Sequence, residues 1–261
     1  MSAPERAGAH GQVGAAGAIL VGCAGWSLSK EVAAPFPLDG SHRERYAALF
    51  NAVEINSSFY RPHRPQTYAR WAASVPPGFR FSVKLPRSIS HQKRLVDADE
   101  ELQRFAAESG ELGDKLACIL VQLPPSLAFD AALASAFFAR LRLAFPCMLA
   151  CEARHPSWFG DAATAALAAH GISRVHADPP AGQAGPHTPS APEAYLRLHG
   201  TPKIYYSSYS DQYLEHVAQT LRAHARAGRS AWCIFDNTAS GAAVPNALSL
   251  LTLLGNTVDG V

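Results

Sequence analysis

The chain has 261 residues, of which 48% are hydrophobic and 17% charged, so it carries enough apolar surface for a sizeable core and too much for a disordered protein. Its formal net charge at pH 7 is +2, which excludes the strong positive field of a protein that coats nucleic acid. The five cysteines lack CxxC spacing and lie in or beside apolar runs, as expected of reduced, buried thiols in the cytosol.

Residues 1–17 predict a flexible tail, because Gly and Ala without periodicity cannot repay the entropy of ordering. This segment lacks the apolar stretch of a signal peptide, and no run in the chain reaches the length of a membrane span. We therefore expect a cytoplasmic protein without a membrane partner, in which residues 18–261 form a single domain.

Eight nearly continuous apolar runs of strand length follow the tail, a pattern typical of parallel strands covered by helices. These runs are Ile19–Cys23, Ala52–Ile55, Phe79–Lys84, Ala117–Gln122, Met148–Glu152, Ile172–His176, Tyr195–His199 and Ala231–Asp236. Segments with the apolar spacing of crossover helices lie between them: Arg43–Phe50, Pro65–Ala73, Glu100–Glu108, Ala131–Phe145, Ala162–His170, Asp211–Ala227 and Pro245–Leu254.

This alternation gives about 30 residues per strand-and-helix unit, the usual size of a βαβ building block. Eight such units predict an α/β fold, a TIM-type (β/α)8 barrel in a single domain. The alternative is an open doubly wound sheet, which usually shows a G-x-G-x-x-G turn after a strand. The segment Gly22 to Gly25 does not fit that pattern.

Polar side chains end most of the predicted strands, which is where the chemistry of a parallel barrel lies. They include Glu54, Asn56, Lys84, Gln122, Glu152, Arg197, His199, Asp236 and Asn237. Burying an unpaired charge is very costly, so this set implies mutual pairing, a bound ligand, or both. One interpretation is a purely structural ion-pair lattice of Glu54, Lys84, Glu152 and Arg197 that closes the top of the barrel.

Three kinds of chemistry also suit these residues. Lysine and arginine side chains that converge would bind an anion, and barrels often hold phosphate in the loops that here carry Thr201 and Ser240. Two carboxylates in different environments would divide acid and base roles, although spacing does not decide which. Carboxylates with histidines would hold a divalent metal, yet no compact motif such as H-E-x-x-H is present. A nucleophile elbow of the G-x-S-x-G type is also missing.

Seven motifs resemble the YecE-like family, a group of uncharacterised proteins with a domain of unknown function. They are GCAGWS, FNAVEINSSFYR, FSVKLPRSISHQKRL, LVQLPPS, CEARHPSWF, YLRLHG and FDNTASGAAVPNAL, and together they run from about Val21 to Leu254. The resemblance implies a TIM-type barrel with the motif residues at the carboxyl ends of its strands, and it implies no particular activity. The chain departs from the family pattern at Ala24, Leu85 and Ala153, where Ser, a small residue and Phe are common.

From the charged and aromatic residues at the strand ends we expect a hydrolase or lyase that acts on an anionic, ring-containing substrate: a sugar phosphate, a nucleotide or a nucleic-acid end. The candidate catalytic residues are Glu54, Glu152, His199 and Asp236. The candidate substrate-binding residues are Trp26, Asn56, Tyr60, Lys84, Arg87, His91, Gln122, Arg154, His155, Trp158, Arg197 and Asn237. The alternative is a non-catalytic protein that binds nucleic acid or a metabolite at the same mouth. The sequence leaves open whether a divalent metal is bound and how many subunits associate.

Overall fold

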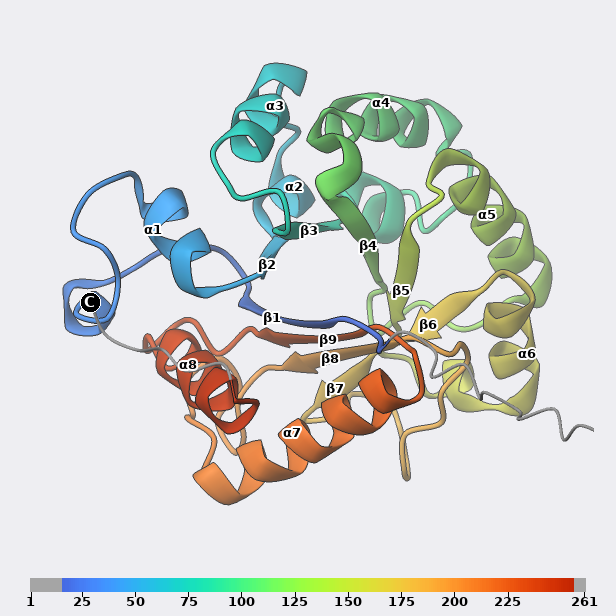
Figure 1. The fold of residues 1–261 in the computed structure, drawn as a ribbon. Coiled ribbons are helices and arrows are strands. Elements are labelled where there is room, and N and C mark those ends of the chain that lie inside the picture. Colours follow the sequence, from blue (N-terminus) through green and yellow to red (C-terminus); the bar gives the residue numbers. More distant parts are fainter. Residues whose placement is uncertain (1–15, 256–261) are drawn as a thin grey trace, which may run out of the picture.

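The computed structural model describes residues 16–255, so residues 1–15 of the predicted tail lie outside the described residues. The last residue of that predicted tail, Gly17, is part of the fold, since its N–H donates to the carbonyl of Ala225 at 2.9 Å. Figure 1 shows the strands in the centre of the molecule and the helices around the outside.

The strands of the described part are all paired in parallel. They are β1 (Ile19–Cys23), β2 (Ala52–Ile55), β3 (Arg80–Lys84), β4 (Leu116–Gln122), β5 (Met148–Glu152), β6 (Ile172–Arg174), β7 (His176–Asp178), β8 (Ala194–Leu198) and β9 (Ala231–Phe235). The α/β class and the parallel pairing predicted from the apolar runs are therefore confirmed.

The α-helices follow the strands in sequence, as predicted, with one additional short helix, α2, directly after β2. They are α1 (His42–Leu49), α2 (Ser57–Tyr60), α3 (Pro65–Ala73), α4 (Asp99–Ser109), α5 (Ala131–Ala144), α6 (Asp161–Ala169), α7 (Asp211–Arg226) and α8 (Ala243–Leu253). Short helical turns cover Lys30–Val32, Ser88–Gln92, Gly110–Lys115 and Pro156–Phe159. Asp130 caps α5 by accepting from the Leu133 N–H at 2.8 Å, the role expected of an acidic residue before an Ala-rich run.

Backbone hydrogen bonds do not close the strands into one ring. They form a four-stranded sheet in the order β1-β9-β8-β7 and a five-stranded sheet in the order β2-β3-β4-β5-β6. The parallel sheet is thus confirmed, and the closed barrel is replaced by two sheets that share one interior.

Side chains bridge the first gap between the sheets, which lies between β1 and β2. The Asn51 amide donates from Nδ2 to the Ile19 carbonyl at 2.8 Å and accepts from the Val21 N–H at 2.9 Å. The Tyr46 hydroxyl accepts from the Cys23 N–H at 2.7 Å and donates to the Ala52 carbonyl at 2.9 Å. These two side chains take the place of the missing backbone ladder.

The second gap divides the predicted strand Ile172–His176. Its first part, β6, pairs with β5, and β7 begins at His176 and pairs with β8. Val175 still donates its N–H to the Cys151 carbonyl at 2.9 Å, so the chain passes from one sheet to the other directly after it. One apolar run therefore forms two short strands because each half binds a different neighbour.

Two clusters of apolar side chains pack against the sheets, one on their outer faces and one between their inner faces. The larger one packs the helices onto the outer faces of the strands, for example through Leu214, Val217 and Leu221 of α7. The smaller one fills the interior with Leu20, Ala52, Cys118, Leu120, Ala150, Val175, Tyr195, Trp232 and Ile234. Since these residues come from both sheets, the inner faces of the sheets pack against each other below the polar strand ends. None of the helices within residues 16–255 is both long and apolar enough to cross a bilayer.

Candidate active site at the carboxyl ends of the strands

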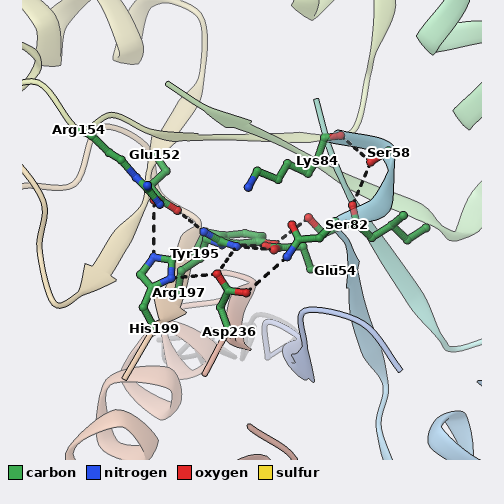
Figure 2. A network of polar contacts seen from close by, with 12 residues as sticks. Glu54, Ser58, Ser82, Lys84, Glu152, Arg154, Tyr195, Arg197, His199 and Asp236 are labelled. Atoms are coloured by element: carbon green, nitrogen blue, oxygen red, sulfur yellow. Dashed lines mark hydrogen bonds and ion pairs between the residues drawn. The ribbon is translucent and has the colours of Figure 1, made fainter. Parts of the chain in front are cut away.

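Arg197 of β8 is the centre of a buried polar network (Figure 2). Its Nε and Nη2 donate to the two carboxylate oxygens of Glu54 on β2, at 3.0 and 2.6 Å. Nη1 donates to Glu152 Oε2 at 2.5 Å and Nη2 to Asp236 Oδ2 at 3.0 Å. One guanidinium thus binds three carboxylates that come from both sheets.

Tyr195 bonds to this network from the side of the interior that the two sheets share, two positions before Arg197 on β8. Its hydroxyl lies 2.9 Å from Glu54 Oε2 and 2.7 Å from Ser82 Oγ, and its side chain has no exposed surface. Tyr195, Arg197 and His199 lie two residues apart along β8 and its end, so they point to the same side of the sheet. Each step along this face brings the next polar group closer to the mouth.

Glu152 at the end of β5 joins the network to Arg154 and His199. Arg154 donates from Nε and Nη2 to Glu152 Oε1 at 2.8 and 2.6 Å. His199 donates from Nδ1 to Asp236 Oδ2 at 3.0 Å, and its Nε2 lies 3.6 Å from Glu152 Oε1. The His199 ring is thereby held between two carboxylates.

The charges of the network lower the pKa values of two of its carboxylates and raise the pKa of its histidine. Burial raises the pKa of Glu152, but Arg197, His199 and Arg154 outweigh it and hold that pKa well below its usual range. The same balance, with Arg197 as the main cation, lowers the pKa of Asp236. Burial lowers the pKa of His199, yet its bonds to Asp236 and Glu152 raise it overall. Glu152 and Asp236 are therefore ionised at neutral pH, and His199 is the group suited to donate a proton.

Lys84 ends β3 beside this network without joining it. Its side chain is 7% exposed, and no hydrogen bond or ion pair to Nζ occurs within residues 16–255. Nζ lies 4.4 Å from the centre of the Phe59 ring, and Figure 2 shows the side chain reaching toward Glu152 and Arg154. Burial lowers the pKa of Lys84 to about 8, and Arg197 lowers it too, while Glu54, Glu152 and Asp236 act in the opposite direction.

Further cations lie on the rim above Lys84. Burial lowers the pKa of His91, and Lys84, Arg154 and Arg87 add to that effect, so three cations surround this imidazole. The His91 ring packs edge-on against Phe59 with the ring centres 4.9 Å apart. A cavity of about 300 Å³ beside Phe59 is lined by aromatic and charged side chains of both signs, among them Tyr60, Arg61, Arg87, Arg104, Glu101 and Glu108. The cations and aromatic rings of this rim therefore lie among acidic side chains.

The structure brings most of the predicted catalytic and binding residues together at one end of the strands. Glu54, Lys84, Glu152, Arg154, Arg197, His199 and Asp236 form the network and its edge, and Asn56 Nδ2 lies 3.5 Å from Asp236 Oδ1. Gln122 pairs in register with Glu152 and is 7% exposed. Tyr60 is 71% exposed, so its ring is open to a ligand.

Other predicted binding residues are occupied by contacts within the protein. Trp158 is 1% exposed and donates from Nε1 to the Leu127 carbonyl at 2.9 Å. Asn237 has no exposed surface and donates to the Ser207 carbonyl at 3.0 Å. His155 Nδ1 bonds to Ser157 Oγ at 2.8 Å at the start of a helical turn, and Trp26 packs against Trp71. Trp158 and Asn237 are buried and position loops in this structure, whereas Trp26 and His155 are half-exposed beside these contacts.

The loops predicted to hold phosphate likewise bond to the protein itself. The Thr201 hydroxyl donates to Asp178 Oδ1 at 2.6 Å, and the Ser240 hydroxyl donates to the Tyr206 carbonyl at 2.5 Å. Lys203 Nζ lies 4.2 Å from the centre of the Tyr206 ring. The cations suited to an anion are therefore those above β3 and β5.

Sequence reasoning missed three residues of the site. Tyr195 lies two positions before Arg197, so the same alternation that paired Arg197 with His199 also points to it. Ser82 pairs in register with Glu54, a relationship that requires knowledge of the strand pairing. Ser58 donates from Oγ to the Lys84 carbonyl at 2.7 Å and lies on α2, which has no signal of its own.

Within residues 16–255, no three His, Cys, Asp or Glu side chains are grouped so as to hold a metal ion. At the strand ends the carboxylate oxygens face guanidinium groups, as the bonds of Arg197 and Arg154 show. The donor set present there suits cation-to-carboxylate pairing.

These features define a parallel α/β protein with a buried acid and base network at the carboxyl ends of its strands. Residues 20–261 match the family described as "Protein of unknown function DUF72", and the chain belongs to this family. The resemblance noted in the sequence is thereby confirmed.

Curated relatives carry names without an activity. The chain is 33% identical to the UPF0759 protein YecE of Escherichia coli K12 over 106 residues, which cover 41% of this chain and 38% of that protein. It is 24% identical to the UPF0759 protein YunF of Bacillus subtilis 168 over 277 aligned residues, which cover 93% and 97% of the two chains. The matched stretch thus spans well under half of YecE and nearly all of YunF.

Two solved structures share the fold. A DUF72 family protein of Enterococcus faecalis V583, EF0366, superposes with a TM-score of 0.78 at 20% identity over 91% of this chain and 96% of its own. A DUF72 family protein of Thermotoga maritima MSB8, TM1631, gives a TM-score of 0.74 at 26% identity over 91% and 99%. The arrangement of elements is therefore that of the family.

Proposed function

We propose that the protein is a hydrolase or lyase that acts on a small anionic, ring-containing substrate at the carboxyl ends of its strands. The single observation that carries this proposal is Lys84, whose side chain is largely buried and whose ammonium keeps some exposed surface but has no acceptor within residues 16–255. A purely structural lattice would pair every buried charge, because an unpaired one costs stability. An anionic ligand that binds to the Lys84 ammonium would explain why this unpaired charge is present.

In this function the two sheets act as two halves of one barrel, and the ligand enters the mouth that the two halves share. Glu54, Glu152 and Lys84 come from the five-stranded sheet, and Arg197, His199 and Asp236 come from the other or its end. The substrate would therefore lie over the line where the halves meet.

In this proposal His199 is the general acid, because Asp236 and Glu152 favour its protonated form. Arg197 positions the carboxylates and does not touch the substrate, because its side chain has no exposed surface. Lys84 faces the substrate and meets its oxygen atoms, together with Arg154 Nη1, for which residues 16–255 provide no acceptor. The exposed Tyr60 ring stacks on its sugar or base.

Negative charge on the substrate follows from the balance of the site. The carboxylates of Glu54, Glu152 and Asp236 are bonded to Arg197 or Arg154, while Lys84, Arg87 and protonated His199 add positive charge beside them. Phosphate and carboxylate groups are the anions that such cations bind well.

Thermal unfolding of the full chain with ribose 5-phosphate, AMP and glycerol 3-phosphate tests this proposal. We expect at least one of these anions to raise the midpoint of the wild-type protein in proportion to the logarithm of its concentration. The Lys84→Met variant should lose that shift, and the matched variant Lys93→Met, in a half-buried ion pair with Glu101, should keep it. A shift that is equal in both variants would overturn the proposal.

The second candidate is a non-catalytic protein that binds nucleic acid at the same mouth. The observation that favours it is the exposure of Tyr60, Tyr205 and Tyr206, which offer planar faces to unpaired bases. Titration with single-stranded DNA over a salt series tests it. Binding that weakens with rising salt would support this candidate, and no binding at low salt would remove it.

A further inference from the structure

The amine of Lys84 is a reactive group that lies beside the acid and base network and is bonded to none of its members. The chain contains five lysines. Of the four lysines other than Lys84, three bond to or pack against neighbouring groups through Nζ. Lys115 Nζ donates to the Ala72 and Val75 carbonyls at 2.6 Å, Lys93 pairs with Glu101, and Lys203 lies over Tyr206. Lys84 differs from these because it is buried beside an acid and base network and bonded to none of its members.

The backbone holds Lys84 in a fixed place. Its neighbours Val83 and Leu85 have no exposed surface, and its carbonyl accepts from Ser58 Oγ at 2.7 Å. Ser58 in turn lies 3.0 Å from the Ile55 carbonyl, so α2 is fastened to the ends of both β2 and β3. In Figure 2 a dashed line reaches the Lys84 carbonyl and none reaches its amine. The amine is thus positioned by packing on Phe59 and left free for a reaction.

We propose that Lys84 Nζ is the nucleophile that forms a Schiff base with an aldehyde or ketone carrying an anionic group. This inference rests on the proposed function and narrows it to a lyase for carbonyl compounds. Three observations support it: the amine is free, it is buried at the mouth, and a proton donor and cations for the anionic group surround it.

The amine must be neutral to attack, and the surroundings of Lys84 raise the share of that form. Burial and the nearby Arg197 disfavour the ammonium, which brings the pKa of Lys84 to about 8. Desolvation and a neighbouring cation are the two means by which proteins activate lysine amines. The four remaining lysines have no comparable combination of burial and neighbours in this structure.

The reaction balances with groups at the site. The nitrogen lone pair forms a C–N bond to the carbonyl carbon, and the C=O π pair moves to oxygen, which takes a proton from His199. The nitrogen then loses one proton to the solvent, and the hydroxyl takes up one proton and leaves as water while the C=N bond forms. The overall change converts amine, carbonyl compound and one proton into an iminium ion and water.

Cations next to the amine provide a place for the anionic group of such a substrate. Arg87 and Arg154 lie close enough to His91 to lower its pKa together with Lys84. A carboxylate or phosphate near the carbonyl would contact these cations while the carbonyl carbon faces Nζ. A neutral carbonyl compound lacks that second contact.

Trapping by reduction tests the inference on the full chain. The protein is incubated at pH 7 with pyruvate, or with glyceraldehyde 3-phosphate, in the presence of sodium cyanoborohydride, and its mass and peptides are measured. We expect one adduct whose mass equals that of the probe minus one oxygen atom, located on Lys84. Lys84 should react faster than the other lysines, because burial and Arg197 lower its pKa and raise its neutral share.

Two variants complete the test. Lys84→Arg keeps the charge and should lose the adduct, whereas Lys93→Arg should retain it. Adducts spread evenly over the lysines, or their absence from Lys84 with both probes, would overturn the Schiff base. Glycerol 3-phosphate and lactate, which have no carbonyl able to react, separate the two proposals. If they raise the unfolding midpoint while no adduct forms, the Schiff base fails and the proposed function stands; if neither anions nor probes act, both fail.

Discussion

Arg197 and Glu54 face each other from different sheets and form two parallel hydrogen bonds, Nε to Oε2 at 3.0 Å and Nη2 to Oε1 at 2.6 Å, with no exposed surface on either side chain. Such paired bonds fix both distance and orientation. Since β8 and β2 belong to separate hydrogen-bonded sheets, this ion pair ties the two halves of the fold together across their interior.

The Arg197→Met variant should lose about 3–5 kcal/mol of unfolding free energy, because it leaves Glu54, Glu152 and Asp236 buried without their common partner. Urea unfolding at pH 7 measures the loss. Arg140→Met is the matched control: its pair with Asp99 is exposed, so its loss should stay below about 1 kcal/mol. Equal losses in the two variants would contradict the central role of Arg197.

Lys84→Met should behave in the opposite way. Removing a buried ammonium that has no acceptor within residues 16–255 should leave the unfolding free energy unchanged or raise it by about 1–3 kcal/mol. The same urea experiment measures it. A variant that is stable and yet fails to bind anions would show that Lys84 is kept for function. A large loss of stability would instead make Lys84 part of the structural lattice.

The contribution of His199 should depend on pH with a definite sign. Burial opposes its charge, but Asp236 and Glu152 raise its pKa above that of the unfolded chain. A raised pKa adds stability that is complete below the unfolded value of about 6.5 and disappears as the pH rises through the folded value. The difference in unfolding free energy between wild type and His199→Gln should therefore shrink as the pH is raised.

Asp236, Glu152 and Arg197 keep their charges across this window, since their pKa values are shifted away from it. His170→Gln, outside the site, is the matched histidine removal. A difference for His199→Gln that stays flat or grows with pH would rule out the assigned protonated state.

Tyr46→Phe should weaken the first gap between the sheets. The change leaves the Cys23 N–H and the Ala52 carbonyl without a buried partner, which costs about 1–3 kcal/mol. Tyr68→Phe is the matched control, because the Tyr68 hydroxyl is buried without a partner in the described part of the chain and its loss removes no bond. Thermal unfolding of both variants compares them, and equal midpoints would speak against the bridge.

Most strands were predictable from the sequence because each apolar run is short and bounded. Ile19–Cys23 and Met148–Glu152 match β1 and β5 at both ends. The gaps between the sheets were not predictable, since Asn51 and Tyr46 act through bonds to residues that are distant in the chain. The division at Val175 depends on which neighbour each half of the run binds, and the run itself contains no break.

The members of the site were more predictable than their roles. A charged residue such as Arg197 between apolar neighbours has to be paired, and its position at a strand end indicates where. That one guanidinium binds three carboxylates depends on the side-chain geometry of both sheets. The burial of Trp158 and Asn237 follows from helix and loop packing, which motifs do not reveal.

The composition of the two sheets bears on how the chain folds during its synthesis. The strands β2 to β6 are consecutive in the chain, whereas the other sheet combines β1 with β7, β8 and β9. A ribosome therefore completes the five-stranded half first, with Glu54 and Glu152 lacking the arginine that neutralises them. Only when β8 emerges does Arg197 arrive, so the network around it cannot form before most of the chain has been synthesised.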